Sequence, residues 1–223
     1  MKPIILYGNN PVAKRVYLES KNDENFRVAA ICVGDNFFNG ESVNYGLPLV
    51  AESEVTQKYP PNEYDMLSCV DAPSRLRNRL VVYDRLKNMN YSLRNFISPF
   101  AYVYEDVKML ENNIIFAFAQ IGDNSYLGHS NIIRNAAIIS HDARIGNGTN
   151  IGTGSVIGGS VNIGDSCWLG LNCTINNCIN ISNETLIGSG AVIIKNTDEG
   201  TAYVGNPARV ISSHKETGIM LNF

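Results

Sequence analysis

The chain has 223 residues, of which 44% are hydrophobic, and a formal net charge of −3. This length permits two small domains with cores of their own, and the slight negative charge gives no electrostatic reason to expect a nucleic acid or an anionic membrane surface as a partner. The longest apolar runs are too short to span a bilayer, and the first residues turn polar too early for a signal peptide.

The first 95 residues alternate short apolar runs with helical stretches. The pattern predicts strands at 4–7, 27–33, 64–70 and 93–97, with helices at 12–20, from about 52 and at 73–89. Between the second strand and the second helix we expect a loop that carries Gly46, Leu47, Pro48 and Leu49. This alternation of strand and helix favours a small parallel sheet of the Rossmann type, that is, an α/β domain.

Polar residues follow three of these strands at the edge where ligands gather in parallel sheets. The first strand leads to Gly8, Asn9 and Asn10, while the second leads to Asp35 and the third to Asp71. A dinucleotide fingerprint needs further glycines that this loop lacks, so NAD is not expected. The rim is therefore a candidate ligand site of another kind, and the alternative is a docking domain with an empty rim.

Residues 97–193 carry an aliphatic residue at every sixth position. The full set is Ile97, Val103, Met109, Ile115, Ile121, Leu127, Ile133, Ile139, Ile145, Ile151, Ile157, Ile163, Leu169, Ile175, Ile181, Ile187 and Ile193. A period of six is neither helical nor that of a simple alternating strand, and it indicates a solenoid of short flat faces joined by turns. Three hexads would close one triangular coil of 18 residues. At about 4.8 Å per coil, the resulting prism would be roughly 25 Å tall.

This hexapeptide pattern resembles the left-handed parallel β-helix of the hexapeptide-repeat acyltransferases. The order of a small Rossmann-like domain, a G-x-P-L segment, the prism and then Gly205, Asn206, Pro207 and Ala208 resembles the group of sialic-acid O-acetyltransferases and bacillosamine (nucleotide-amino-sugar) N-acetyltransferases. The resemblance implies a Rossmann-like sugar-nucleotide-binding domain at 1–95 and a left-handed β-helix acetyltransferase domain with a C-terminal tail at 96–223. It also implies acetyl-CoA as co-substrate, a sugar or nucleotide sugar as acceptor, a role in bacterial surface-glycan biosynthesis, and a homotrimer with active sites between neighbouring prisms.

The catalytic candidates are His141 and Asp142. A neutral imidazole can take a proton from a sugar amine or hydroxyl that attacks a thioester, and Asp142 matches the acidic partner of the base in the resembling group. One coil of 18 residues beyond His141 lies Gly159, whose backbone N–H we expect to serve as an oxyanion donor; corner geometry alone is the alternative. The same column continues to Asn177 and Lys195.

The resemblance implies further contacts with the coenzyme. Leu171 and Ser189 match positions that touch it, although packing between subunits is an equal alternative. Asn150 stands where many relatives carry a second histidine. Lys195 and Arg209 are the cations available near the coenzyme phosphates, and a solvated surface charge is an equal alternative for each. In the same way, Gly8, Asn9, Asn10, Asp35 and Asp71 become candidates for binding the sugar nucleotide.

Other classes of function make different predictions. A γ-type carbonic anhydrase shares the prism but needs three zinc-binding histidines, and this chain has only three, one of them in the tail, so no metal is expected. His129 is expected at the surface on another face. The five cysteines, with no CxxC pair, are interpreted as buried free thiols in a cytoplasmic protein. A sialic-acid-type O-acetyltransferase and a catalytically silent binding or scaffold protein stay open.

Overall fold

The computed structural model describes residues 1–41, 43–71 and 75–220. The amino-terminal part follows the predicted order through the third helix, with a hairpin of two further strands. Its elements are β1 (Ile4–Tyr7), α1 (Pro11–Ser20), β2 (Val28–Val33), the 3-10 helix η1 (Asp35–Phe37), β3 (Val43–Asn44), β4 (Leu47–Ala51), α2 (Glu52–Lys58), β5 (Asp65–Ser68) and α3 (Asn78–Asn88). The strand predicted at 93–97 is not part of its sheet: Leu93 makes a single parallel bridge with Met66, and Phe96–Ile97 belongs to the prism.

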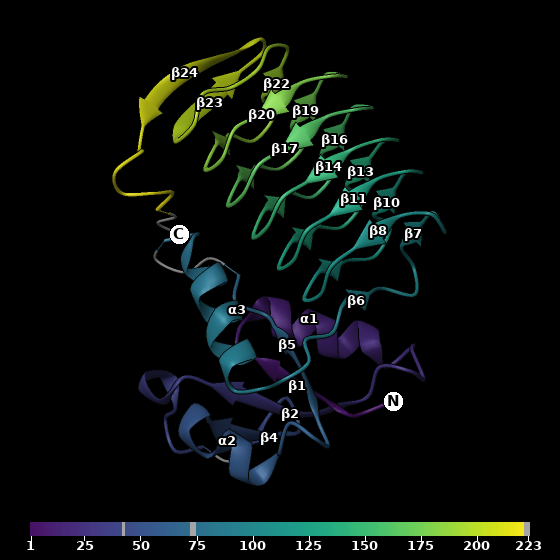
Figure 1. Cartoon of the computed structure of the whole chain (residues 1–223), viewed down its shortest axis with the longest axis vertical. Helices are drawn as coiled ribbons and strands as arrows, with labels where there is room; N and C mark the ends of the chain where they lie inside the picture. The colour runs from purple at the N-terminus through teal and green to yellow at the C-terminus, as the bar shows by residue number, and fades with distance from the viewer. Residues whose placement is uncertain (42, 72–74, 221–223) are drawn as a thin grey trace.

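These strands form one sheet in the order β3-β4-β2-β1-β5 (Figure 1). All pairs are parallel except the β3–β4 hairpin. The parallel sheet confirms the prediction, but the segment around Pro48 is a strand and not the expected loop. Pro48 lies opposite Val43 in the β3–β4 hairpin, and pairing with β2 begins only at Leu49, so Pro48 lies outside the parallel ladder. Helix α3 begins at Asn78, later than predicted, and the predicted start at 73 lies outside the described residues.

Alternating side chains of β1 face two separate cores. Ile4 and Leu6 pack with α1 and with residues of the prism, whereas Ile5 and Tyr7 pack with α2 and α3. Because both faces of the sheet are covered, its central strand β1 is apolar at every position. The same arrangement brings the face that carries α1 directly against the prism.

From β6 onward the chain winds into stacked coils of two-residue strands on three faces. Face C holds β6 (Phe96–Ile97), β9 (Ile114–Ile115), β12 (Ile132–Ile133), β15 (Asn150–Ile151), β18 (Trp168–Leu169) and β21 (Leu186–Ile187). Face D holds β7 (Tyr102–Val103), β10 (Gln120–Ile121), β13 (Ile138–Ile139), β16 (Val156–Ile157), β19 (Thr174–Ile175) and β22 (Val192–Ile193). Face E holds β8 (Lys108–Met109), β11 (Tyr126–Leu127), β14 (Arg144–Ile145), β17 (Asn162–Ile163) and β20 (Asn180–Ile181).

The register of these strands gives the circumference of the coil. Ile121 pairs with Ile139, which pairs with Ile157, each partner lying 18 residues further along the chain. This confirms the predicted three-sided winding, and the stacked parallel strands agree with the expected β-helix. The aliphatic positions are buried from Ile115 onward, but Ile97 is 37% exposed, because the first coil has no further coil beneath it.

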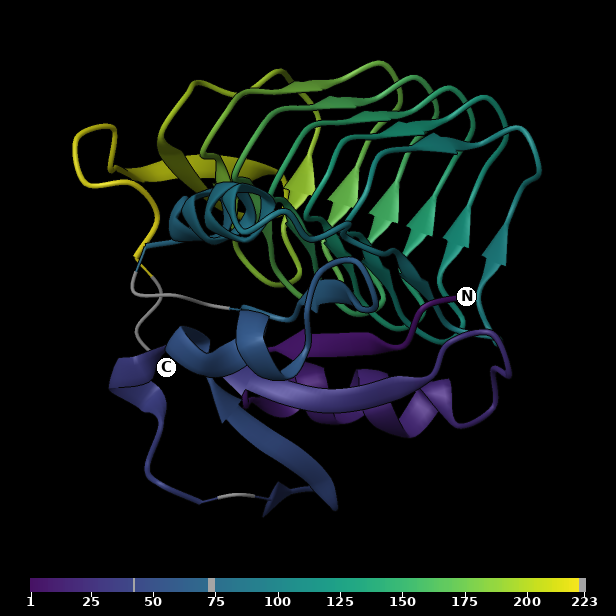
Figure 2. The ribbon, with the colours of Figure 1, turned by 60° about the horizontal axis from the view of Figure 1, so that its bottom comes forward.

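Face C of the prism packs against the amino-terminal sheet (Figure 2). Its outward residues Phe96, Ile114 and Ile132 are fully buried in the core that includes α1. Faces D and E thus remain the exposed sides of the prism. At the far end, the antiparallel hairpin of β23 (Thr201–Gly205) and β24 (Ala208–Ser213) continues the sheet of face C beyond the last coil.

Two arginines at the start of α3 connect the amino-terminal part to the prism. Arg79 at the start of α3 is buried and donates to the backbone oxygens of Ser130 (2.7 Å) and Gly148 (3.2 Å) in the prism, and burial lowers its pKa to about 10. Arg77 forms a two-pronged ion pair with Glu184, with both N–O distances 2.8 Å. None of the described helices is long and apolar enough to cross a membrane.

Candidate active site

His141 lies just beyond β13, at the corner where face D turns into face E. Its Nδ1 lies 2.7 Å from Oδ2 of Asp142, and the two side chains are 57% and 44% exposed. A carboxylate only accepts hydrogen bonds, so Nδ1 carries the proton and Nε2 is left with a free lone pair. The pair therefore has the geometry of an oriented general base, on a corner that is open to solvent in the single chain.

Asn124 completes this pair, and the sequence analysis did not identify it. Its Nδ2 donates to Oδ1 of Asp142 at 2.5 Å, so both carboxylate oxygens of Asp142 are held. The 18-residue spacing could have identified Asn124, because it lies one coil before Asp142 in the same column. The chain thus provides a relay from Asn124 through Asp142 to His141.

Hydrogen bonding within this relay sets the charge of its members. The hydrogen bond to Asp142 raises the pKa of His141 above its ordinary value, with smaller contributions from the charges of Asp142 and Asp123. The pKa of Asp142 is lowered, first by its hydrogen bond with His141 and then by the one with Asn124. Asp142 is therefore ionised at neutral pH, and His141 is a stronger base than a free imidazole.

Replacing Asp142 with asparagine should move the acidic limb of the pH profile. The base acts only when deprotonated, so the rate of any reaction that needs it rises with pH through the pKa of His141. Without the carboxylate that pKa falls toward its ordinary value, so the limb moves to lower pH while the plateau rate drops because the base is weaker and less well oriented. The measurement is kcat/KM against pH for both proteins. An unmoved limb would mean that Asp142 does not set the basicity of His141.

Gly159 lies directly beside the imidazole, as the 18-residue spacing predicts. A Cβ atom at this position would come within 2.6 Å of Nε2 and 2.7 Å of Cε1 of His141. Only a residue without a side chain leaves the ring in this place. The backbone N–H of Gly159 is not free, however, because it donates to Oδ1 of Asn177 at 2.9 Å. The predicted oxyanion donor is thus in position but already has an acceptor.

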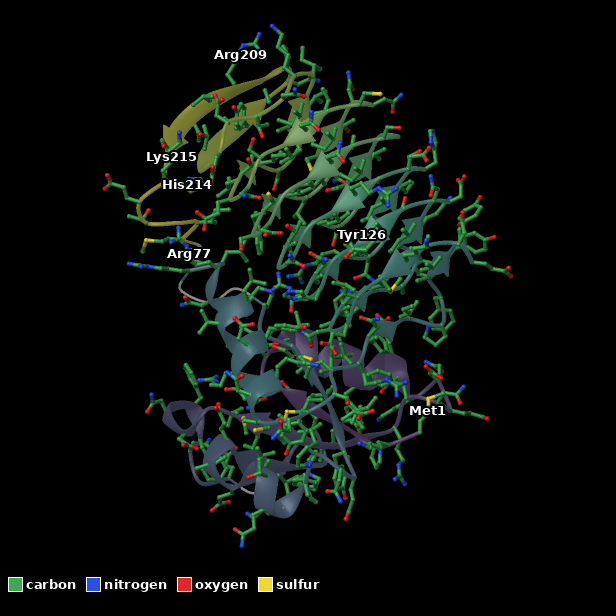
Figure 3. All side chains as sticks on the ribbon, viewed as in Figure 1. Met1, Arg77, Tyr126, Arg209, His214 and Lys215 are labelled. Carbon is green, nitrogen blue, oxygen red and sulfur yellow. The ribbon has the colours of Figure 1, made fainter. Side chains whose placement is uncertain are left out.

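The coenzyme candidates lie on two different corners. Asn177 and Lys195 continue the column of His141 and are exposed, whereas Leu171 and Ser189 lie at the corner between faces C and D. There the N–H of Leu171 donates to Oγ of Ser189 at 3.2 Å, and Leu171 is 54% exposed. Arg209 is exposed on the hairpin at the far end of the prism, opposite the end near Met1 (Figure 3).

Asn150 does not lie near His141. It is on face C, is 1% exposed, and its Oδ1 accepts a hydrogen bond from Nε of Arg134 at 3.0 Å. Arg134 in turn forms a short ion pair with Asp71 of the amino-terminal part. The structure therefore gives Asn150 a place in the packing of the two parts, and its burial leaves it no surface for a coenzyme.

The predicted rim is partly taken up by structural contacts. Asn10 caps α1 by accepting from the backbone N–H groups of Val12 and Ala13, and its Nδ2 donates to the backbone oxygen of Cys69. Oδ1 of Asp35 accepts from the N–H of Ser53 at 3.0 Å. Asp71 pairs with Arg134, as described above, so these three side chains have structural partners.

Two residues of the rim keep the character that was predicted. Gly8 has φ +122°, a conformation that favours glycine, and Asn9 is exposed. They lie just ahead of α1, where the chain leaves the sheet toward the prism.

Two surface predictions need correction. Four of the five cysteines are buried as expected, but Cys178 is exposed, because it lies at a corner position in the same column as Asp142. His129 is half-buried and stacks on Tyr83 of α3 with ring centroids 3.9 Å apart, so it belongs to the contact between the two parts. The described residues contain no group of three or more potential metal ligands.

Comparison with known proteins places this geometry in context. No family model matches the chain, and no curated protein matches it. Solved structures do. PerB from Caulobacter crescentus, in complex with CoA and GDP-perosamine, is 22% identical, with 95% of this chain and 98% of PerB covered and a TM-score of 0.85. The fold is shared over almost the whole chain.

Two further structures extend the comparison. The acetyltransferase domain of PglB from Neisseria gonorrhoeae, in complex with acetyl coenzyme A, is 20% identical over 94% of this chain and 99% of that domain, with a TM-score of 0.84. WeeI from Acinetobacter baumannii is 19% identical over 95% of this chain and all of its own (100%), with a TM-score of 0.83. Structures of the Caulobacter enzyme with a histidine replaced by alanine or by asparagine also match. The shared architecture therefore includes both the amino-terminal sheet and the prism.

Proposed function

We propose that the chain is an acetyl-CoA-dependent N-acetyltransferase acting on the amino group of a nucleotide-linked sugar. The observation that carries this proposal is the oriented base His141, held by Asp142 and Asn124, beside the bare backbone of Gly159. Support comes from a fold matched over 95% of the chain by PerB, which was solved with CoA and GDP-perosamine. Histidine variants of that enzyme, named as a GDP-perosamine N-acetyl transferase, support the choice of a histidine base.

The proposed reaction forms one bond and breaks another. The sugar amine attacks the thioester carbonyl carbon while Nε2 of His141 takes the proton that the nitrogen loses. The tetrahedral intermediate carries its negative charge on the former carbonyl oxygen, and a backbone N–H stabilises it. The C–S bond then breaks, and the imidazolium returns its proton to the sulfur. The products are the acetamide and CoA, and the base is regenerated.

We propose a division of labour between residues 1–95, as a Rossmann-like sugar-nucleotide-binding domain, and residues 96–223, as the acetyltransferase domain. We place the sugar nucleotide near Gly8 and Asn9. The other three rim candidates have the structural partners described above. The coenzyme is placed along the column from His141 toward Lys195. Four buried free cysteines agree with a protein of the reducing cytoplasm.

A homotrimer fits the exposed surfaces of the prism. His141 stands on an open corner, so a neighbouring prism is needed to wall the site. Face D beside it presents a column in which the apolar side chains of Tyr102, Ile138 and Val156 are 61%, 41% and 41% exposed, with Gln120 between the first two. Such a patch favours contact with another protein surface. Light scattering of the purified chain tests this assembly.

The function is tested by a screen of acceptors. UDP-, dTDP- and GDP-linked amino sugars and free sialic acid are each supplied with acetyl-CoA, and release of the CoA thiol is followed. Turnover with a nucleotide-linked amino sugar is the expected result. Turnover with sialic acid alone would instead indicate O-acetylation, and a chain that neither binds nor cleaves acetyl-CoA would be a scaffold without catalysis.

The exposed thiol of Cys178 reports on where the coenzyme lies. Burial raises the pKa of the Cys32 and Cys167 thiols to about 12 and also raises those of Cys69 and Cys173, so alkylation of the native protein should modify Cys178 alone. Because Cys178 lies beside Asn177 in the proposed path, saturating CoA should slow its alkylation severalfold. Mass spectrometry of the alkylated protein measures this. Equal rates with and without CoA would place the coenzyme on another corner.

A further inference from the structure

The backbone N–H of Gly159 is the donor nearest to the base, and Asn177 occupies it. The bond from Gly159 N to Asn177 Oδ1 is 2.9 Å long, while Nε2 of His141 lies 2.6 Å from the position that a Cβ of the same glycine would take. The acceptor is a carboxamide oxygen, which is chemically close to the carbonyl oxygen of a thioester. The Asn177 side chain therefore occupies the position from which an acetyl oxygen would accept a hydrogen bond from Gly159 N–H.

This bond differs in setting from the similar bonds elsewhere in the prism. At the corner between faces E and C, the N–H groups of His129, Asn147 and Asp165 each donate to the side chain 18 residues further on, forming a continuous ladder. Along the column of Asp123, His141, Gly159, Asn177 and Lys195, the part of the chain that the structure describes contains this bond at Gly159 alone. The bond is therefore isolated, and it is placed at the base.

The two partners also differ in exposure. Gly159 is buried, whereas Asn177 is exposed. Turning an exposed asparagine side chain away from the corner disturbs no packed core, so the carboxamide can leave while the backbone N–H stays fixed. A fixed donor with a movable acceptor is suited to exchange one carbonyl oxygen for another.

We propose that Asn177 closes the oxyanion donor of the free enzyme, and that the acetyl oxygen of acetyl-CoA displaces the Asn177 carboxamide from Gly159 N–H. This inference rests on the proposed acetyl transfer. With the carboxamide displaced, Gly159 N–H can donate to the oxygen on which negative charge develops as the amine attacks. When the C–S bond has broken and the acetamide has left, CoA has no oxygen at this point, and Asn177 returns. Asn177 is thus a positioning residue that makes the site distinguish acetyl-CoA from free CoA.

The prediction concerns the ratio of two affinities. Acetyl-CoA must displace Asn177, but free CoA does not, so the asparagine weakens only the acetylated form. In Asn177→Ala the competitor is gone, and acetyl-CoA should bind about two- to tenfold more tightly relative to CoA, the equivalent of one net hydrogen bond. In Asn177→Asp a carboxylate is the stronger acceptor, so the ratio should move the other way. Both ligands carry the same phosphates, so the effect of the added charge on them cancels in the ratio.

Isothermal titration of the full chain with CoA and with acetyl-CoA measures this ratio for the wild type and both variants. Asn183→Ala is the matched control, because Asn183 accepts from the N–H of Asp165 at 2.8 Å on the other corner. It should lower the midpoint of thermal unfolding but leave the ratio unchanged. A purely structural Asn177 would behave in the same way, and an unchanged ratio in both Asn177 variants would overturn the inference.

The outcomes also separate this inference from the proposed function. One outcome is that the wild type binds acetyl-CoA and transfers the acetyl group while the ratio of acetyl-CoA to CoA affinity is unchanged in both Asn177 variants. In that case the proposed function stands and the proposed role of Asn177 is wrong. If the wild type does not bind acetyl-CoA at all, both fail. If Asn177→Ala does not fold, the opposite shift in Asn177→Asp still decides the matter.

Discussion

Replacing His141 with alanine is expected to slow acetyl transfer by about 10²- to 10⁴-fold, the usual contribution of a general base. The variant loses the group that takes the proton from the attacking amine. It should fold normally, because the side chain is 57% exposed and its hydrogen-bond partner Asp142 is also at the surface. Initial rates of thiol release, together with the midpoint of thermal unfolding, measure the two effects separately.

His129→Ala provides a control within the same chain. This histidine stacks on Tyr83 and does not approach the corner of His141. Its loss should weaken the packing of α3 on the prism and lower the unfolding midpoint, while turnover per folded molecule stays at the wild-type value. Near-normal turnover in His141→Ala would show that His141 is not the general base, whatever the stability of either variant.

The prism could be predicted in detail because one physical rule repeats along it. Each coil buries one aliphatic residue per face, and the strand register follows from the spacing alone, as the pairing of Ile139 with Ile157 confirms. The prediction of the amino-terminal sheet was less complete. Pro48 suggested a loop, since proline cannot donate in a strand, but Pro48 lies opposite Val43 in the β3–β4 hairpin, and the pairing of β4 with β2 begins one residue later.

The candidate site divides in the same way. Spacing correctly brought Gly159 beside His141, because both lie in one column of the prism. It could not show that Asn177 turns its carboxamide onto Gly159, because a register fixes backbone positions and leaves side-chain torsions free. Asn124 was within reach of the same rule and was overlooked.

Two further candidates have structural partners that the sequence did not show. Asn150 and Asp71 were assigned to ligands, yet both meet Arg134 where face C packs on the amino-terminal sheet. Nothing in the hexad period says which of three faces is covered. That choice depends on tertiary packing: the outward residues Phe96, Ile114 and Ile132 of face C are buried against the amino-terminal part, whereas the outward apolar residues of face D stay exposed.

The second large effect is expected from Gly159→Ala. The new methyl group would come within 2.6 Å of Nε2 of His141, far closer than two non-bonded atoms allow. The ring is the far end of an exposed side chain, so it can swing outward, and the fold should tolerate the change. In doing so the imidazole leaves its place beside Asp142. We expect turnover to fall by about 10²- to 10³-fold, because the base is displaced and the oxyanion donor is crowded.

A double-mutant cycle with His141→Ala separates these two causes. If the methyl group acts only by displacing the ring, adding Gly159→Ala to a chain that already lacks the imidazole should cost nothing more. If crowding of the Gly159 N–H also matters, the double variant should be slower than His141→Ala alone, by the share that belongs to the oxyanion donor. Single-turnover rates with saturating acetyl-CoA measure all four corners of the cycle. Fully additive losses would show that Gly159 and His141 act independently, and would contradict the prediction that a methyl group at Gly159 displaces the ring.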